Sequence, residues 1–189
     1  CLSLKSRALL NQVFVKGLLM AKLYLKGFES KRRQPYAKMM GHSDIIITSL
    51  KKELLNSFVD FRKKSKIEND WMRKVTKEDA EKFLLESDDK KAFVALRDNS
   101  IVGQLFTLEI KKSSLLTIRL ISVLKSEYGR TTAKQLLEFA EKIAIDNKYK
   151  TIDLYVDKMN ARAISFYTKH GYQKNKSPSS KTFRYIKTL

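Results

Sequence analysis

The spacing of apolar positions divides the chain into two parts of different texture. In residues 1–70, apolar side chains recur every three or four positions with lysines between them, which is typical of amphipathic helices. The pattern predicts one helix over residues 4–28 and a second that begins at Ser43 or Asp44. Pro35 and the basic residues before it separate the two helices, because proline disfavours helix in the preceding residue. The apolar stripe of the second helix comprises Ile47, Leu50, Leu54, Leu55, Phe58 and Phe61.

After residue 70, short β-like runs alternate with helical stretches. The runs predict strands over residues 71–75, 92–97, 101–110, 115–124, 151–156, 172–174 and 182–187, and helices over 76–85, 131–147 and 161–170. Thr76 and Asp79 are spaced as a capping box, and Asp98-Asn99-Ser100 predicts a hairpin turn. Gly171 ends the last helix. This order predicts an α/β (α+β) fold with a mixed sheet flanked by helices.

The change of texture predicts two parts: a basic helical extension over residues 1–70 and a folded domain over residues 71–189. The chain carries 39 Lys and Arg against 20 Asp and Glu, a formal net charge of +19. The excess is denser in the extension, and it favours phosphate-bearing partners such as nucleic acid, an anionic membrane face or a phosphorylated cofactor. A well-solvated basic surface is the alternative. The helical stripes of the extension favour packing on a neighbouring domain or on a second copy in a homodimer.

Cysteine and hydropathy indicate the compartment. Cys1 is the single cysteine, so no intramolecular disulfide can form, which fits a reducing compartment. The sequence has no run of about 18 to 20 apolar residues that could span a bilayer and no convincing signal peptide. A cytoplasmic location, or delivery to a cytosol, is the expectation. His42 has no Cys or second His nearby, so no metal site is expected.

Four motifs after residue 70 carry further information. They are Trp71-Met72-Arg73-Lys74-Val75-Thr76-Lys77-Glu78-Asp79-Ala80; Phe93-Val94-Ala95-Leu96 with Ile101-Val102-Gly103; Tyr128-Gly129-Arg130-Thr131-Thr132-Ala133 after a strand ending at Val123; and the spaced set Leu154, Val156, Asn160, Ala163, Phe166, Tyr167, Lys169, Gly171 and Tyr172. Together with the order of elements, they resemble the GNAT superfamily of N-acetyltransferases across residues 71–189. The resemblance implies a mostly antiparallel mixed sheet and an acetyl-coenzyme A (acetyl-CoA) donor.

The third motif resembles the family's pyrophosphate loop with two departures. Tyr128 stands where Arg or Gln is usual, and Thr131 stands where the first Gly is usual, whereas Ala133 fits. In such a loop, N–H groups at the start of the following helix point at the pyrophosphate. Thr131 either obstructs the phosphates with its Cβ or donates its hydroxyl to them. The resemblance implies that coenzyme A is bound by Ile121, Val123, Tyr128, Gly129, Arg130, Thr131, Thr132, Ala133, Lys134 and Asn160.

The resemblance also implies the reaction, a direct attack of a primary amine on the thioester. Main-chain N–H groups of residues 121–123 would stabilise the oxyanion, and Tyr167 would protonate the leaving thiolate as the general acid. On the last helix Asn160, Ala163 and Tyr167 share one face. Glu109 and Glu127 are candidate bases only by proximity in sequence, and a water relay is an equal alternative, so no base is assigned.

The acceptor amine and two alternative functions stay open. A basic protein suits acidic proteins, nucleotides or charged RNA such as aminoacyl-tRNA better than polyamines. One alternative is a GNAT-fold scaffold that no longer binds acetyl-CoA because of Tyr128 and Thr131. The other is an association with nucleic acid through the basic extension. The cations of that proposed footprint are Lys31, Arg32, Arg33, Arg62, Lys63 and Lys64.

Overall fold

The computed structural model describes residues 45–68, 76–85 and 90–189. The predicted helix over residues 4–28, the predicted strand over 71–75, the basic residues 31–33 and His42 lie outside the described residues. In the described part, no helix is long and apolar enough to cross a membrane.

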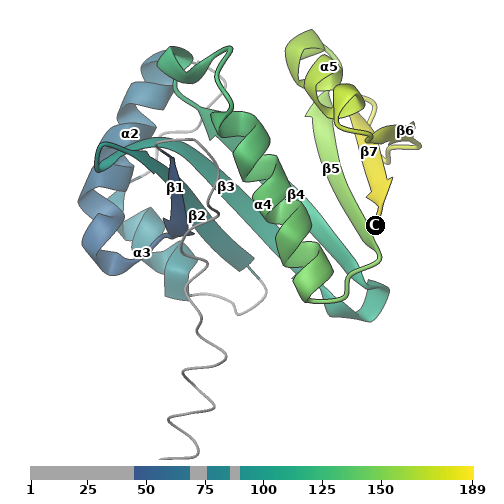
Figure 1. Ribbon diagram of the computed structural model, residues 1–189, viewed down its shortest axis with the longest axis horizontal. Helices are drawn as coiled ribbons and strands as arrows, with labels where there is room; N and C mark the ends of the chain where they lie inside the picture. Colours follow the sequence, from purple (N-terminus) through teal and green to yellow (C-terminus); the bar gives the residue numbers. More distant parts are fainter. Residues whose placement is uncertain (1–44, 69–75, 86–89) are drawn as a thin grey trace, which may run out of the picture. The chain divides into compact units, whose positions relative to one another are not determined.

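A seven-stranded sheet forms the centre of the described structure (Figure 1). Its spatial order is β1-β2-β3-β4-β5-β7-β6, and all neighbours are antiparallel except β4 and β5, which are parallel. The predicted mixed, mostly antiparallel sheet flanked by helices is confirmed. The strands are β1 (Ile46–Ser49), β2 (Lys90–Arg97), β3 (Ser100–Ile110), β4 (Leu115–Val123), β5 (Thr151–Asp157), β6 (Gln173–Asn175) and β7 (Thr182–Thr188).

The predicted helix from Ser43 or Asp44 is wrong in its first part. Residues 46–49 form β1, and Ile46 pairs with Leu96 of β2. The run Ile45-Ile46-Ile47-Thr48 is entirely β-branched, and such side chains favour a strand where a partner edge is available. The helix begins later, as a 3-10 turn η1 (Lys52–Leu54) followed by α2 (Leu55–Glu68). Residues before 71 therefore contribute one strand to this sheet and one helix that packs on it.

Helices cover both faces of the sheet (Figure 1). On one face, the ring of Phe58 of α2 lies 6.1 Å from that of Phe106 of β3. The short helix α3 (Lys77–Leu85) lies on the same side and contacts β2. On the other face lies α4 (Thr132–Asp146), which contacts β3, β4 and β5. Successive residues of a strand point to opposite faces, so Leu105 faces α4 where Phe106 faces α2.

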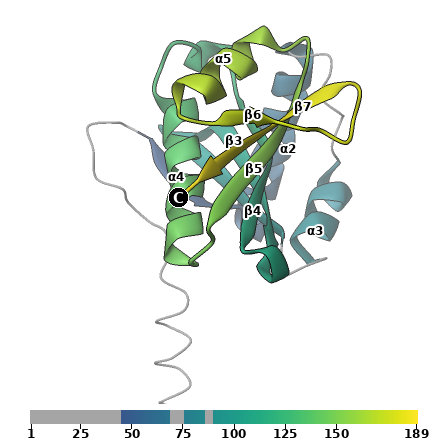
Figure 2. The same cartoon turned by 90° about the vertical axis from the view of Figure 1, so that its right-hand side faces the viewer.

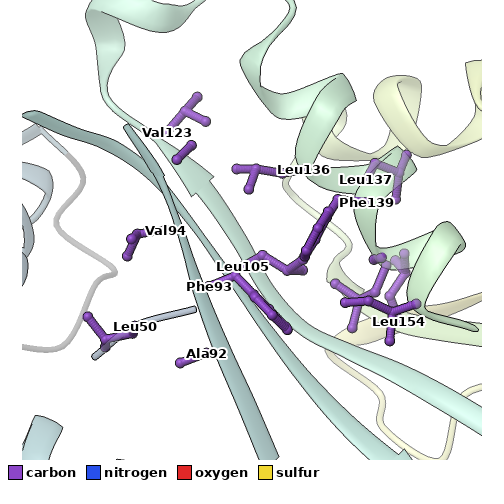
Figure 3. Close-up of a cluster of buried hydrophobic side chains, with 14 of the residues drawn as sticks. Leu50, Ala92, Phe93, Val94, Leu105, Val123, Leu136, Leu137, Phe139 and Leu154 are labelled. Atoms are coloured by element: carbon purple, nitrogen blue, oxygen red, sulfur yellow. The ribbon is translucent and has the colours of Figure 1, made fainter. Parts of the chain in front are cut away.

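The core between the sheet and α4 is closely packed (Figure 3). Phe93 and Phe139 meet edge to face with ring centroids 5.0 Å apart, and Leu105 and Leu136 are fully buried. Gly103 permits this approach, because a Cβ there would lie 3.0 Å from Leu136 Cδ1. The helix α4 is thereby held tightly against β3 and β4, and its N-terminus has a fixed place beside the end of β4.

The local turn and cap signals are confirmed. Asp98 and Asn99 have φ values of 48° and 60° and connect β2 to β3 as a two-residue hairpin. Thr76 Oγ1 accepts from the N–H of Asp79 and the Asp79 carboxylate accepts from the N–H of Thr76, both at 3.1 Å, which is the predicted capping box before α3. The last helix α5 (Ala161–Lys169) is followed by Gly171 at φ +83°.

Candidate functional site

A cleft opens where the two parallel strands part. The pairing of β4 with β5 runs from Leu115 and Thr151 to Ile118 and Leu154 and then stops, although both strands continue. A cavity of about 730 Å³ lies between the separated ends. In Figure 2, β5 lies between β4 and β7, with α5 near its upper end. The lining residues include Ile121, Val123, Tyr128, Ala133, Asp157, Asn160, Arg162 and Tyr167.

A β-bulge in β4 marks the start of the cleft. Thr107 of β3 pairs with Ile118, and its neighbour Phe106 pairs with Leu120, so Arg119 is an extra residue without a partner on β3. Bulges bend a strand and increase its twist locally. The bend falls at the residue after the last β4–β5 pair, which explains why β4 leaves β5 at this point.

The backbone of β4 presents free donors to the cleft. The N–H of Leu124 donates to Val102 O at 3.0 Å, so this pair is hydrogen-bonded across the antiparallel ladder. Bonding and non-bonding positions alternate in such a ladder, so the N–H groups of Ile121 and Val123 point away from β3. They point toward the side where β5 has separated. Two main-chain donors therefore face the cavity from one strand.

The start of α4 supplies a second group of donors. Thr131 is the N-cap residue and makes no side-chain cap hydrogen bond. The first N–H groups of an α-helix, here those of Thr132, Ala133 and Lys134, have no acceptor within the helix. The positive end of the helix dipole lies at the same place. Since Ala133 also lines the cavity, the helix start opens toward the cleft.

Tyr167 reaches the cleft from α5. Its side chain is buried, lines the cavity and meets the rings of Phe166 and Tyr172 edge to face, at 5.2 and 5.7 Å. Burial raises the pKa of the Tyr167 hydroxyl well above its usual value. The hydroxyl is therefore protonated at neutral pH. Asn160 caps the same helix, since its Oδ1 accepts from the N–H of Ala163 at 3.0 Å.

A cleft between parting parallel strands, with main-chain donors on one side and a helix start at its mouth, fits a donor that bears both a carbonyl and phosphates. Residues 52–172 match the model of the acetyltransferase (GNAT) family. The chain belongs to the GNAT family of acetyltransferases. As a GNAT enzyme it is an N-acetyltransferase with acetyl-CoA as its acetyl donor. No curated protein sequence matches the chain.

Solved GNAT structures share the fold at low sequence identity. The PaiA N-acetyltransferase from Thermoplasma acidophilum in complex with coenzyme A is 22% identical, with a TM-score of 0.67 over 77% of this chain and 99% of that chain. An acetyltransferase from Thermus thermophilus is 18% identical, with a TM-score of 0.66 over 79% and 100%. A GNAT acetyltransferase from Staphylococcus aureus is 16% identical, with a TM-score of 0.63 over 77% and 99%.

The GNAT cleft gathers part of the predicted site. Ile121, Val123, Tyr128, Ala133, Asn160 and Tyr167 line the cavity. Gly129, Arg130, Thr131, Thr132 and Lys134 are not among its lining residues, although they form the loop and first helical turn beside it. Gly129 has φ +79° and Thr131 has φ −83°. The loop therefore uses glycine where the backbone requires it, and Thr131 has an ordinary helical conformation.

The side chain of Thr132 does not line the GNAT cleft. Its side chain is fully buried, and its Oγ1 donates to Glu127 Oε2 on the inner side of the loop. Arg97 at the end of β2 approaches the same carboxylate, with Nε 3.2 Å from Oε1 and Nη2 3.1 Å from Oε2. Sequence reasoning did not identify Arg97, which lies 30 positions from Glu127. The sequence indicated only that Arg97 is the last residue of a predicted strand and directly precedes a predicted hairpin turn.

The candidate bases are not in the cavity. Glu127 is buried in the cluster just described, and Glu109 accepts a hydrogen bond from Tyr149 Oη at 3.1 Å. Neither is a lining residue of the GNAT cleft. Of the described residues that line it, Asp157 alone carries a carboxylate, and its Oδ1 accepts from the N–H of Met159 at 2.8 Å. The described residues also contain no group of three or more His, Cys, Asp or Glu that could hold a metal ion.

Arg162 is a second residue that sequence reasoning missed. It belongs to the first turn of α5, and its guanidinium carbon lies 3.2 Å from the centroid of the Tyr128 ring. Both side chains line the GNAT cleft. Guanidinium groups stack favourably on aromatic faces. The contact therefore connects the loop after β4 to the helix after β5 and holds a cation between them.

The prediction that Arg62 belongs to a nucleic-acid-binding surface is wrong. Arg62 of α2 is buried, with 5% of its surface exposed, so it cannot form part of a surface for nucleic acid. Lys63 and Lys64 on the same helix are exposed, and Lys63 pairs with Asp60 at 3.1 Å. Helical periodicity explains the difference, because Arg62 lies on the face of α2 that also carries Phe58 and Ser65.

Proposed function

We propose that this GNAT enzyme acetylates a primary amine by direct attack on acetyl-CoA in the cleft between β4 and β5, with Tyr167 as the general acid. The observation that carries the proposal is the loss of β4–β5 pairing after Ile118 and Leu154. It leaves two main-chain donors of β4 and the hydroxyl of Tyr167 around one cavity. This arrangement supports a reaction in which negative charge develops first on an oxygen and then on a sulfur.

The strand β4 would hold the reacting end of acetyl-CoA. The N–H groups of Ile121 and Val123 would donate to the pantetheine and to the thioester oxygen as it becomes negative. The amine nitrogen first forms a bond to the carbonyl carbon, which places negative charge on the oxygen, and the carbon–sulfur bond then breaks. The departing thiolate takes the proton of the Tyr167 hydroxyl, the amine loses a proton to solvent, and the tyrosinate regains a proton from solvent before the next turnover. Asn160 orders the loop beneath the pantetheine by capping α5.

The loop after β4 would hold the pyrophosphate. The N–H groups of Thr132, Ala133 and Lys134 at the start of α4 would donate to its oxygens, together with those of Gly129 and Thr131. Arg130 and Lys134 are exposed on this loop and first turn and add positive charge. Thr131 needs no strained backbone to stand where glycine is usual. This conformation supports retained binding over a scaffold that has lost acetyl-CoA.

The stack of Arg162 on Tyr128 supports the same conclusion. Tyr128 replaces the Arg or Gln usual at its position, but the guanidinium of Arg162 lies directly over its ring. We infer that Arg162 supplies to the pyrophosphate the cation that position 128 lacks. Tyr128 would then serve as the platform that orients it.

For the acceptor, we propose an amine that carries an anionic group. A second cavity of about 630 Å³ adjoins the end of β5 and the β6–β7 hairpin, and Lys158, Lys174 and Lys176 line it. The ammonium groups of Lys158 and Lys174 lie 5.2 and 3.5 Å from the Phe183 ring centroid. None of the three lysines forms an ion pair with a carboxylate among the described residues. An acidic acceptor would neutralise this cluster.

Release of the coenzyme A thiol from acetyl-CoA, with matched acidic and lysine-rich peptides as acceptors, tests the proposed function. We expect amine-dependent thiol release that is faster with the acidic peptide. The variant Lys174→Gln should reduce this preference, whereas Lys148→Gln, at an exposed position after α4, should not. Equal rates with both peptides would contradict an anionic acceptor, and thiol release that never depends on an amine would contradict N-acetyl transfer.

We further propose that the catalytic domain includes the described residues from Ile45 onward and that the basic extension lies within residues 1–44. The pairing of β1 with β2 and the packing of Phe58 of α2 on Phe106 support this earlier boundary. A steep fall of RNA affinity with salt, lost on deleting residues 1–44, would support a role of the extension in binding nucleic acid. Salt-independent self-association would instead support its packing as a homodimer interface.

A further inference from the structure

A buried ionic cluster lies on the inner side of the loop that precedes α4. It consists of Arg97, Glu127 and Thr132, and we call it the loop cluster. Glu127, the last residue of the 3-10 turn η3 (Lys125–Glu127), is 4% exposed, and both of its carboxylate oxygens accept hydrogen bonds from the other two members. The contacts join the end of β2, the loop and the first residue of α4. The end of β2 thus meets the loop and the start of α4 at one carboxylate, although Arg97 lies 30 positions before Glu127.

Glu127 holds the loop through its backbone as well. Its N–H donates to Leu124 O at 2.9 Å, and its carbonyl accepts from the N–H of Arg130 at 3.2 Å. The segment from Leu124 to Thr132 is therefore fixed at its start, its middle and its end by one residue. This is the segment whose N–H groups would meet the pyrophosphate.

The charge of Glu127 is retained at neutral pH. Burial alone raises the pKa of this carboxyl, but the hydrogen bonds from Thr132 and Arg97 and the positive charges of Arg97 and Arg130 outweigh it, so the pKa is lowered. A carboxylate beside the start of α4 would repel a phosphate. The bidentate contact of Arg97 offsets that charge, so the positive potential of the helix start remains available to an anion.

The loop cluster does not take part in the chemistry directly. All three side chains are absent from the cavity lining, and the carboxylate already accepts three hydrogen bonds. A base must reach the proton it removes, which Glu127 cannot do from this position. Any effect of the cluster on acetyl transfer must therefore act through the loop.

We propose that Arg97, Glu127 and Thr132 are positioning residues that fix the loop and the first turn of α4 in the geometry that binds the pyrophosphate of acetyl-CoA. The proposal rests on the proposed function, since it assumes that acetyl-CoA occupies this loop. It assigns Glu127 to cofactor affinity and not to proton transfer.

The structure offers a matched control elsewhere in the sheet. Asp153 of β5 is also buried, accepts from Thr117 Oγ1 at 2.6 Å and accepts from Arg184 Nε at 2.8 Å. Thr132→Val and Thr117→Val therefore each remove one threonine hydroxyl that donates a hydrogen bond to a buried carboxylate, and each of these carboxylates also contacts an arginine. Neither Thr117 nor Asp153 lines the cleft. Only Thr132 adjoins the loop, so a difference between the variants reports on the loop.

Calorimetric titration of acetyl-CoA into the full chain tests the proposal. We expect Thr132→Val to raise the Kd about tenfold, equivalent to about 1.4 kcal/mol, and Thr117→Val to change it by less than about twofold. Thr132→Ser, which keeps the hydroxyl, should bind as the wild type does. Urea unfolding of both valine variants shows whether they lose comparable stability, so that a general loss of folding is separated from a loss of positioning.

The affinity for acetyl-pantetheine, which lacks the pyrophosphate, distinguishes positioning of the loop from a general effect of Thr132 on the structure of the site. This affinity should be the same for the wild type and for Thr132→Val, because the loop contacts only the missing part. Equal Kd changes in both valine variants, or an equal loss for acetyl-pantetheine, would overturn the proposal. A wild type that does not bind acetyl-CoA would refute the proposed function itself, whereas tight binding by both wild type and Thr132→Val would refute only the positioning role.

Discussion

Ile118 of β4 and Leu154 of β5 are the last residues that pair across the two parallel strands of the sheet. The next residue of β4, Arg119, is the extra residue of a β-bulge. The strands diverge from this point, and the backbone donors of Ile121 and Val123 turn toward open space instead of a neighbouring strand. One irregularity in β4 thus creates both the cavity and its donors.

Tyr167→Phe should separate chemistry from binding. The substitution removes the hydroxyl and retains the ring that packs on Phe166 and Tyr172. We expect turnover to fall roughly tenfold or more, as for the loss of a general acid, with the Kd for acetyl-CoA nearly unchanged. Steady-state kinetics and calorimetry on the same preparation measure the two quantities. Unchanged turnover would remove Tyr167 from the mechanism.

The pH dependence of turnover offers a second test of Tyr167. Burial raises the pKa of its hydroxyl above the ordinary value of about 10, so the acid form persists across the neutral and mildly alkaline range. We expect the rate at saturating substrates to show no decline from loss of this proton between about pH 7 and 9. A descending limb in that range that disappears in Tyr167→Phe would contradict the raised pKa.

Substitutions at positions 162 and 128 test whether Arg162 supplies the positive charge that binds the pyrophosphate. Arg162→Gln should weaken acetyl-CoA binding about fivefold to tenfold, because a charged donor is lost. Adding Tyr128→Arg to that variant should restore most of the affinity. Lys169→Gln, at an exposed position on the same helix and outside the cavity lining, controls for net charge. Failure of the double variant to recover would show that Arg162 does not replace a cation at position 128.

Glu127 should contribute to the acid stability of the fold. Its pKa in the folded protein is below the ordinary value of about 4.3, so its stabilisation is present above that pH and is lost as the pH falls through the folded value. Glu127→Gln should therefore be less stable than wild type at neutral pH but lose less stability on acidification. Urea unfolding between about pH 7 and 3 measures both curves. Parallel curves would contradict the lowered pKa.

Local signals predicted much of the fold. The hairpin at Asp98 and Asn99, the capping box of Thr76 and Asp79 and the end of α5 at Gly171 each depend on residues within a few positions of one another. Such patterns specify turns and caps without reference to the rest of the chain. The strands and helices after residue 90 accordingly lie within one or two residues of their predicted bounds.

The features that the sequence concealed depend on distant partners. Ile47 matches the helical spacing of the following stripe, yet its segment forms a strand because β2, more than 40 positions later, offers an edge. Arg97 and Glu127 are 30 positions apart, and Arg162 stacks on Tyr128 only because α5 lies opposite the loop. The bulge at Arg119 likewise follows from strand register. Periodicity within one segment carries no information on such contacts.

The binding of acetyl-CoA to the full chain, with Thr131→Gly beside the wild type, tests most directly whether the loop before α4 holds the pyrophosphate. Thr131 has an unstrained backbone at φ −83°, so we expect wild type to bind with a Kd on the order of micromolar and Thr131→Gly to change it only slightly. An absence of binding by the wild type that Thr131→Gly restores would contradict this, and would show that the Thr131 side chain obstructs the phosphates.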